Sequence, residues 1–396
     1  MSTTHDVIVV GARCAGAATA MLLARRGLRV LVLDRARYGS DAVSTHALMR
    51  GGVRHLHRWG LLDQIIAAGT PPVTKVVFHY PDEITPISLK PAAGVDALYA
   101  PRRTVLDPVL ADAAMAAGAD LSFETTVTGL LRDDTGRVTG VVARNRQGHP
   151  LTATAPLTIG ADGIRSVVAR EVDARTTRTA DGDGSAFLYG YWDDLPVEGY
   201  EWLYAPGESA GLIPTNNGQT VVFAGTTPAR MKSVRRAGTA HQAFGSVLAA
   251  VSPTAYERVS AARAPAQLHG FVGLPGYLRQ AWGPGWALVG DAGGFEDPLS
   301  THGITDAFHE AELLASAVLD IQGGTASEAD ALVRYQRTRD ALCSRLYAAV
   351  ETISSYSWTM PELRKLLMEA GAAMTEQIEL MQALDHDREL TPGAMA

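Results

Sequence analysis

The stretch from Asp6 to Asp34 decides the fold. It reads Asp-Val-Ile-Val-Val-Gly-Ala-Arg-Cys-Ala-Gly over residues 6–16, then an alanine-rich segment, then Leu-Arg-Val-Leu-Val-Leu-Asp over residues 28–34. The apolar run 7–10 lacks polar alternation, which is typical of a parallel strand buried on both faces. Residues 15–26 predict a helix that ends at Gly27, and residues 30–33 predict a second buried strand. Strand, glycine turn, helix and strand with a terminal carboxylate form the βαβ unit that binds an adenine dinucleotide.

This unit predicts where the nucleotide lies. The pyrophosphate is expected over the helix N-terminus, where unpaired N–H groups and the helix dipole favour an anion, and Asp34 is placed to accept hydrogen bonds from the ribose. Arg13 replaces the middle glycine of the fingerprint, and its side chain can point outward or lie over the phosphates. Cys14 is expected to be a small packing residue. The motif alone does not separate NAD from FAD, and an ordinary glycine turn is the alternative.

Length and composition exclude several classes of protein. The chain has 396 residues and is 46% hydrophobic, enough for two or three domains. A net charge of -7 without a basic block argues against a nucleic-acid partner. The longest apolar stretch, residues 15–24, is shorter than the ~20 residues that span a bilayer. No export signal is visible and there are two cysteines, so we expect a cytoplasmic location.

The middle of the chain predicts a second sheet. Residues 74–80 and 84–89 read as a β-hairpin that interrupts the nucleotide-binding alternation, which indicates an inserted domain. Four more predicted strands, separated by Pro, Gly and Asn-rich turns, cover residues 187–192, 201–204, 210–213 and 220–225. The sheet is expected to be mostly antiparallel and to roof a pocket, with three aromatic candidates for its lining: Trp202, Tyr204 and Phe223.

Other segments lead to smaller predictions. Residues 121–131 read as one strand. His55 and His57 lie two apart and cannot share a helix face as metal ligands would, so they are interpreted as surface histidines, and no metal site is expected. A predicted strand at residues 157–159 leads into Gly160-Ala-Asp-Gly163, where Asp162 and Gly163 can face a ligand or form an ordinary Asp-Gly turn. A predicted strand at 286–289 leads to Gly290-Asp291, and Thr301-His302-Gly303 opens a helix whose N-terminus can stabilise negative charge.

Three motifs, taken in order, resemble the FAD-dependent class A flavoprotein monooxygenases, the p-hydroxybenzoate hydroxylase-like family related to flavin halogenases and prenyl reductases. The motifs are Gly11 to Gly16 with Asp34, Gly160 to Gly163 with Ser166, and Gly290 to Ala292 with Pro298 and Gly303, and they cover about residues 5–320. The resemblance implies an α/β fold with three parts: a Rossmann-like FAD-binding domain of GR2 type (residues 1–73, 98–180 and 268–325), an inserted, mostly antiparallel β substrate domain (74–97 and 181–267), and a C-terminal helical region (326–396).

The resemblance also implies which residues bind FAD. Those of the nucleotide half are Gly11, Arg13, Cys14, Ala15, Gly16, Asp34, Arg35 and Val127. Those between the pyrophosphate and the flavin ring are Ser44, Thr45, Arg103, Asp162, Gly163, Gly290 and Asp291. Those beside the isoalloxazine are Pro298, His302, Gly303 and Ile304. Thr305-Asp306 stands where many members carry an asparagine.

The implied activity is oxygenation of a small hydrophobic or aromatic molecule. NADPH or NADH, bound transiently, would reduce the flavin, and O2 would add at C4a to give the hydroperoxide that transfers oxygen. His46 is the candidate catalytic residue, because a histidine can donate a hydrogen bond or move a proton near neutral pH, although a histidine that only stabilises its loop is the alternative. Lys75 suggests a halogenase lysine, but a solvated lysine at a sheet edge is favoured.

Two other functions stay open. The segment Tyr200 to Pro206 loosely resembles the Tyr-x-Trp-x-Phe-Pro of flavin-dependent prenyl reductases, with one extra residue, so reduction of an unsaturated substrate is the first alternative. A non-catalytic flavin-binding protein is the second, because no side chain is clearly catalytic. The substrate, the choice between NADH and NADPH, and the oligomeric state are not determined by the sequence.

Overall fold

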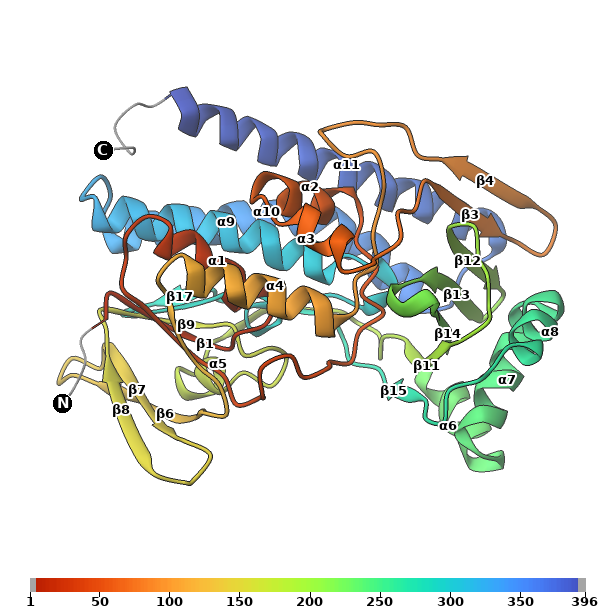
Figure 1. Ribbon diagram of the computed structural model, residues 1–396, viewed down its shortest axis with the longest axis horizontal. Coiled ribbons are helices and arrows are strands. Elements are labelled where there is room, and N and C mark those ends of the chain that lie inside the picture. Colours follow the sequence, from red (N-terminus) through yellow and green to blue (C-terminus); the bar gives the residue numbers. More distant parts are fainter. Residues whose placement is uncertain (1–4, 391–396) are drawn as a thin grey trace.

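A computed structural model describes residues 5–390, and Figure 1 shows its nucleotide-binding sheet and second sheet side by side. The first sheet has six strands in the order β17-β18-β9-β1-β2-β5. Its strands are β1 (Val7–Val10), β2 (Val30–Leu33), β5 (Asp120–Ser122), β9 (Leu157–Gly160), β17 (Trp282–Gly283) and β18 (Trp286–Leu288). All pairs are parallel except β17 with β18. Strands β1 and β2 are completely buried, as predicted for strands covered on both faces.

Alternate residues of β1 and β2 enter two different cores. Val7 and Val9 pack under a helical layer, whereas Ile8 and Val10 pack against a three-stranded sheet. The helical layer contains α1 (Cys14–Ala24), α4 (Arg103–Ala116), α9 (Gly303–Gln322) and α10 (Glu328–Ser354), and the three-stranded sheet is β6 (Thr126–Arg132), β7 (Val138–Arg144) and β8 (Pro150–Thr154). This alternation follows from the two-residue period of a strand.

The second sheet has seven strands in the order β15-β11-β14-β13-β12-β3-β4. Its strands are β3 (Lys75–His79), β4 (Ile84–Ser88), β11 (Ala186–Trp192), β12 (Tyr200–Ala205), β13 (Glu208–Pro214), β14 (Thr220–Thr226) and β15 (His269–Phe271). Only β12 with β3 is parallel. The predicted hairpin and the four predicted strands are therefore confirmed. Three helices that the sequence pattern did not predict cover one face: α6 (Pro228–Ala237), α7 (Ala240–Val251) and α8 (Pro253–Ala261).

The remaining elements complete the two layers. The short helices are α2 (Arg50–Arg58), α3 (Leu62–Ala67) and α5 (Val167–Glu171), with 3-10 turns at Asn216–Gly218, Gly290–Ala292 and Pro298–Ser300. A small sheet joins β10 (Thr176–Thr179), β16 (Tyr277–Arg279) and β19 (Gly294–Phe295). The last helix, α11 (Met360–Leu390), runs along the top of the view in Figure 1, beside α2. Within residues 5–390, no helix is both long enough and apolar enough to cross a membrane.

Two predictions were wrong. Residues 121–131 are not one strand: β5 and β6 belong to different sheets, and the break between them contains Glu124 with φ of 53°. His55 is not a surface residue. Its side chain is 1% exposed and packs against the rings of Trp59, Phe308 and His309, because its face of α2 lies on α9. His57 is exposed, as predicted.

Candidate functional site

The glycine turn after β1 brings two backbone segments into close contact. Gly11 has φ of +106°, and a Cβ at this position would stand 2.4 Å from the Ala161 carbonyl oxygen. A Cβ on Gly16 would stand 1.8 Å from the Gly11 carbonyl oxygen. Only glycine fits both positions, so the first turn of α1 can lie directly against the strand ends. Ala15 is buried in this turn.

Arg13 and Arg103 surround one carboxylate at this turn. Arg103 donates two hydrogen bonds to Asp107, at 2.9 and 3.0 Å, while Arg13 reaches Asp107 at 3.4 Å and the carbonyl oxygen of Asp41 at 3.1 Å. Two guanidinium groups and one carboxylate leave a net positive charge beside the N-terminus of α1, which suits a pyrophosphate. Cys14 donates to Asp107, and burial raises the pKa of its thiol to about 12, so it is a protonated packing residue.

Asp34, at the end of β2, lines a cavity that is open to solvent. Its carboxylate accepts hydrogen bonds of 2.6 Å from the backbone N–H groups of Ala12 and Ala36. The side chains that line the cavity are those of Ala12, Arg13, Asp34, Ala36, Arg37, Tyr38, Ser40, Asp107, Pro108, Ala111 and Phe123. Arg35 is exposed outside it, and Val127 is not part of the lining, since its side chain lies in the core of β6 and β7. The cavity has the polar floor and aromatic wall that suit an adenosine.

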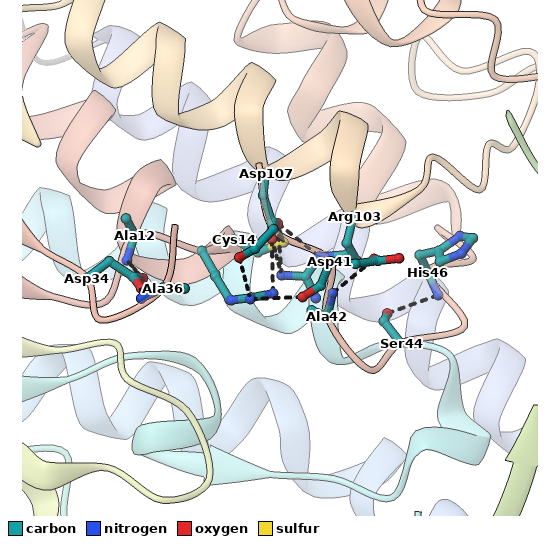
Figure 2. A network of polar contacts seen from close by, with 12 residues as sticks. Ala12, Cys14, Asp34, Ala36, Asp41, Ala42, Ser44, His46, Arg103 and Asp107 are labelled. Carbon is teal, nitrogen blue, oxygen red and sulfur yellow. Dashed lines mark hydrogen bonds and ion pairs between the residues drawn. The ribbon is translucent and has the colours of Figure 1, made fainter. Parts of the chain in front are cut away.

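Figure 2 shows that the polar groups continue from this cavity in one row toward the second sheet. The row contains Asp34, Ala12, Cys14, Asp107, Arg103, Asp41, Ser44 and His46. At its far end, the Ser44 N–H donates to the hydroxyl of Tyr189 on β11 at 3.0 Å, and the Ser44 hydroxyl accepts from the His46 N–H at 3.0 Å. Thr45, between them, is half-buried. The row therefore links the nucleotide end to the aromatic face of the second sheet.

His46 is held rigidly at this junction. It is 2% exposed, has φ of 45°, and its Nε2 lies 3.2 Å from the Tyr191 hydroxyl, with the two rings stacked at 5.8 Å. Burial, together with the charges of Arg102 and Arg103, lowers the pKa of His46 to about 3. The imidazole is therefore neutral at pH 7. Of the two roles expected for a histidine here, this favours donating a hydrogen bond over moving a proton, because the loop that carries His46 is not exposed at this point.

Asp291 follows β18 in the turn that starts at Gly290. Burial raises the pKa of Asp291 to about 6, and the charge of Arg103 opposes this only in part. Among the described residues, no group donates a hydrogen bond to its carboxylate. The turn itself is fixed, since the Gly290 N–H donates to the buried carboxylate of Glu310 at 2.7 Å. A half-buried carboxylate without a donor fits the hydroxyl groups of a ribityl chain.

The segment from Pro298 to Ile304 forms the N-terminus of α9. Around Gly303, no atom lies within 4 Å of the place where a Cβ would stand, so the backbone here is open to a ligand. The side chain of His302 points away from this space: it is 1% exposed, and its Nε2 lies 2.7 Å from Oε1 of Gln377 on α11. Burial lowers the pKa of His302 to about 4. Pro298 and Ile304 are half-buried at the edges of the opening.

The carboxylate of Asp162 is already hydrogen-bonded to groups of its own turn. Its carboxylate accepts from the Ser166 hydroxyl and from the Val167 N–H, both at 2.5 Å, and these bonds fix the start of α5. Gly163 has φ of +76° in the turn. Asp162 thus shapes the turn that borders Gly11.

The three candidates for the substrate pocket lie on one face of the second sheet. Trp202 and Tyr204 alternate along β12, and Phe223 lies 6.2 Å from Trp202 across the sheet, measured between ring centroids. They share a core cluster with the other aromatic residues of this face: Phe187, Tyr189, Tyr191 and Tyr200. The same cluster contains Ala47, Leu98 and Ala100, which follow the polar row along the chain, and side chains from the end of α10 to the start of α11: Ile353, Tyr356, Trp358 and Leu363.

Sequence reasoning missed Arg102, Asp107 and Tyr191. The Arg102 guanidinium lies 3.6 Å above the Tyr191 ring and 2.6 Å from Asp41, which places a cation at the junction of the two sheets. Asp107 stands four residues after Arg103, and this i,i+4 spacing was the signal that could have shown the pair. No sequence signal joins Tyr191 to His46, 145 residues earlier.

These observations fit FAD. The cavity at Asp34 suits the adenosine, and the glycine turn with the positive charge beside it suits the pyrophosphate. The Asp291 carboxylate suits the ribityl chain, and the open N-terminus of α9 suits the flavin ring. They come from distant parts of the chain, yet they meet on one side of the first sheet.

Comparisons with known proteins agree. A family described as FAD binding domain matches residues 4–349. A digeranylgeranylglycerophospholipid reductase of Methanocella arvoryzae is 27% identical over 90% of this chain and 89% of its own length. The squalene epoxidase erg1 of Schizosaccharomyces pombe is 27% identical over 80% of this chain and 70% of its own length.

Among solved structures, pqsL, a probable FAD-dependent monooxygenase from Pseudomonas aeruginosa, has a similar fold. Its TM-score is 0.75 at 20% identity, over 94% of this chain and 100% of that one. The family match covers most of the chain. The chain therefore belongs to the FAD binding domain family.

Proposed function

We propose that this protein is an FAD-dependent monooxygenase that uses NADPH or NADH and O2 to oxygenate a small hydrophobic or aromatic molecule. One observation carries the proposal: the polar row that fits the cofactor ends at an aromatic face, and a neutral His46–Tyr191 pair lies between the two. When bound, the flavin supplies the redox chemistry and the activation of oxygen. The protein supplies binding, orientation and exclusion of water.

The aromatic face selects an apolar substrate. Trp202, Tyr204 and Phe223 are each 7% exposed or less, so this region is poor in water and offers ring contacts. A poorly hydrated site protects a reactive oxygenating species from hydrolysis and side reactions. These side chains are proposed to hold the substrate against the cofactor.

The His46–Tyr191 pair orients a polar group of the substrate. Burial raises the pKa of Tyr191, so its phenol stays protonated, while His46 stays neutral. In the tautomer with a proton on Nε2, the neutral imidazole donates to the phenol oxygen, which leaves the phenol proton free to donate to a substrate oxygen. Arg102, above the Tyr191 ring, adds a positive charge that stabilises a developing negative charge on that oxygen.

Reduction of an unsaturated, prenyl-type substrate is the second candidate. Two observations favour it: the reductase of Methanocella arvoryzae is similar along nearly its whole length, and Tyr200 to Ala205 forms strand β12 of the aromatic face. The same apolar face suits an isoprenoid chain. A non-catalytic flavin-binding role is the third candidate, and it needs no substrate.

Oxygen labelling separates these functions. FAD-loaded protein is incubated with NADPH or NADH, ¹⁸O2 and a panel of phenols, indoles and prenylated compounds, and products are analysed by mass spectrometry. Incorporation of ¹⁸O supports the monooxygenase. Loss of a C=C bond under argon, with no ¹⁸O product in air, would replace it by the reductase. If neither nicotinamide reduces the flavin with any compound, the non-catalytic role is the correct one.

A further inference from the structure

Three side chains with metal-binding groups lie on one face of α9. His302, Asp306 and His309 are spaced i, i+4 and i+7, so they point the same way from the helix. One ligand atom from each lies within 4.8 Å of the others, and the His302 Nε2 stands 3.7 Å from an Asp306 oxygen. The amide oxygen of Gln377 on α11 lies 2.7 Å from the same Nε2. Two imidazoles and two oxygens therefore converge.

The histidines here are buried without enough hydrogen-bond partners. His302 and His309 are 1% and 3% exposed, and the Nδ1 atoms of both have no hydrogen-bond partner. His55 of α2, whose ring lies 5.0 Å from that of His309, has no partner on either nitrogen. A buried polar group without a partner costs about 1–3 kcal/mol. Hydrogen bonds within the protein therefore leave this group of buried histidines incompletely satisfied, and the nitrogen of His302 that faces Asp306 is Nε2.

The carboxyl group of Asp306 also lacks a cationic partner among the described side chains. Among the side chains of residues 5–386, no lysine or arginine forms an ion pair with Asp306. The neighbouring carboxyl groups that act on it are Glu296, Glu310 and Asp291, all of the same sign. A divalent cation between His302 and Asp306 would supply the positive charge that the protein does not.

We propose that His302, Asp306 and His309, with Gln377 as the fourth group, bind a divalent transition-metal ion of the zinc class. Neutral imidazole nitrogen with carboxylate and amide oxygen is a donor set that Zn²⁺ accepts, whereas Ca²⁺ and Mg²⁺ prefer oxygen ligands alone. The side chain of Asp306 is one-fifth exposed, which gives the ion a way in.

Binding of one ion requires the ligand atoms to move by a small amount. Ligand atoms about 2.1 Å from one tetrahedral ion lie about 3.4 Å from one another. The widest pair of the cluster must therefore approach, and His302 Nε2 and the Gln377 oxygen, now 2.7 Å apart, must separate, both by rotation of side chains. The ion replaces the proton between His302 Nε2 and the Gln377 oxygen. It ties the N-terminus of α9 to α11 and thereby fixes the backbone from Ser300 to Gly303, which borders the proposed flavin position.

The test uses full-length, tag-free protein loaded with FAD. The protein is stripped with a chelator, then titrated with Zn²⁺ and with Co²⁺, and the metal content, the Tm and the visible absorption of Co²⁺ are measured. We expect one tightly bound Zn²⁺ per chain, a rise in Tm, and the intense absorption of tetrahedral Co²⁺. Mg²⁺ and Ca²⁺ should not change the Tm.

Variants decide whether these residues are the ligands. Asp306→Asn and His309→Gln should each weaken Zn²⁺ binding at least ten-fold, while His57→Gln, on exposed α2 surface, should bind as the native protein does. If Asp306→Asn fails to fold, the Co²⁺ spectrum of the native protein still decides the case. No retained Zn²⁺ and no metal-dependent Tm, or native affinity in both ligand variants, would overturn the proposal.

Discussion

Replacement of Gly11 by alanine is the sharpest test of the glycine turn that is proposed to hold the nucleotide. A Cβ here would stand 2.4 Å from the Ala161 oxygen and 2.8 Å from the Ala161 carbonyl carbon, both backbone atoms, so the turn after β9 must move. The φ of +106° adds about 1–3 kcal/mol of strain for a residue with a side chain. Because Asp162 and Gly163 continue this turn, the shift reaches the surface that faces the cofactor. We expect FAD affinity to fall at least ten-fold, which is about 1.4 kcal/mol.

Gly118→Ala is the matched control. Gly118 has φ of +100°, no atom lies within 4 Å of the place where its Cβ would stand, and it is exposed at the end of α4. It therefore carries the same backbone strain without the clash. FAD is titrated into both apoproteins and followed by quenching of flavin fluorescence, while the Tm of each apoprotein reports its folding. Equal FAD affinity in folded Gly11→Ala and Gly118→Ala would refute the reasoning.

Three further predictions concern single side chains. Tyr191→Phe removes about 1 kcal/mol of hydrogen bonding to His46 and should lower kcat/KM about five-fold, with KM less affected. Phe187→Leu, on the same face, should change mainly KM. Steady-state kinetics that show equal losses in kcat for both variants would count against an orienting role for Tyr191. Since burial raises the pKa of Asp291 to about 6, the affinity for FAD should be constant above pH 7 and should fall as the carboxylate is protonated below about pH 6. In calorimetric titrations, Asp291→Asn should abolish this pH dependence. Burial would raise the pKa of Glu201, but the neighbouring His79, whose Nε2 lies 3.3 Å from the carboxylate, and two hydrogen bonds from Arg258 outweigh burial and lower the pKa to about 2, below the ordinary 4.5. This contribution, about 2 kcal/mol after solvent screening of Arg258, is present above pH 4.5 and lost as the pH falls through 2. Urea unfolding of Glu201→Gln should therefore show a shallower loss of stability in that range, and parallel pH curves would contradict the account.

Local patterns explain why the first sheet and its cofactor turn could be predicted. The apolar strands at 7–10 and 30–33, the glycines at 11 and 16, and Asp34 act over short stretches, so sequence spacing determines their geometry. The second sheet was predictable for the same reason, since its strands alternate with turn residues. The points where one strand ends and the next begins were harder to predict. Residues 123–125 separate strands of two different sheets, and nothing in the local pattern marks this change of pairing partner.

Long-range contacts explain what could not be predicted. His46 became neutral because β11, Arg102 and Arg103 enclose it, and those neighbours come from separate parts of the chain. His55 became buried because α9, about 250 residues later, covers its face of α2. The side chain of His302 points away from the proposed flavin position and toward Gln377 on α11, and no periodicity in the sequence shows where α11 packs. The helices α6 to α8, by contrast, do carry local signals that could have predicted them: Thr227-Pro228, the capping box of Thr239 with Gln242, and Ser252-Pro253.

A structure of the protein crystallised with FAD tests the central claim most directly. We predict the adenosine in the cavity beside Asp34, the pyrophosphate between Arg13 and the start of α1, and the isoalloxazine over Gly303, facing Tyr191 and Trp202. Density for an isoalloxazine away from the α9 N-terminus, or an adenosine that does not approach Asp34, would contradict it.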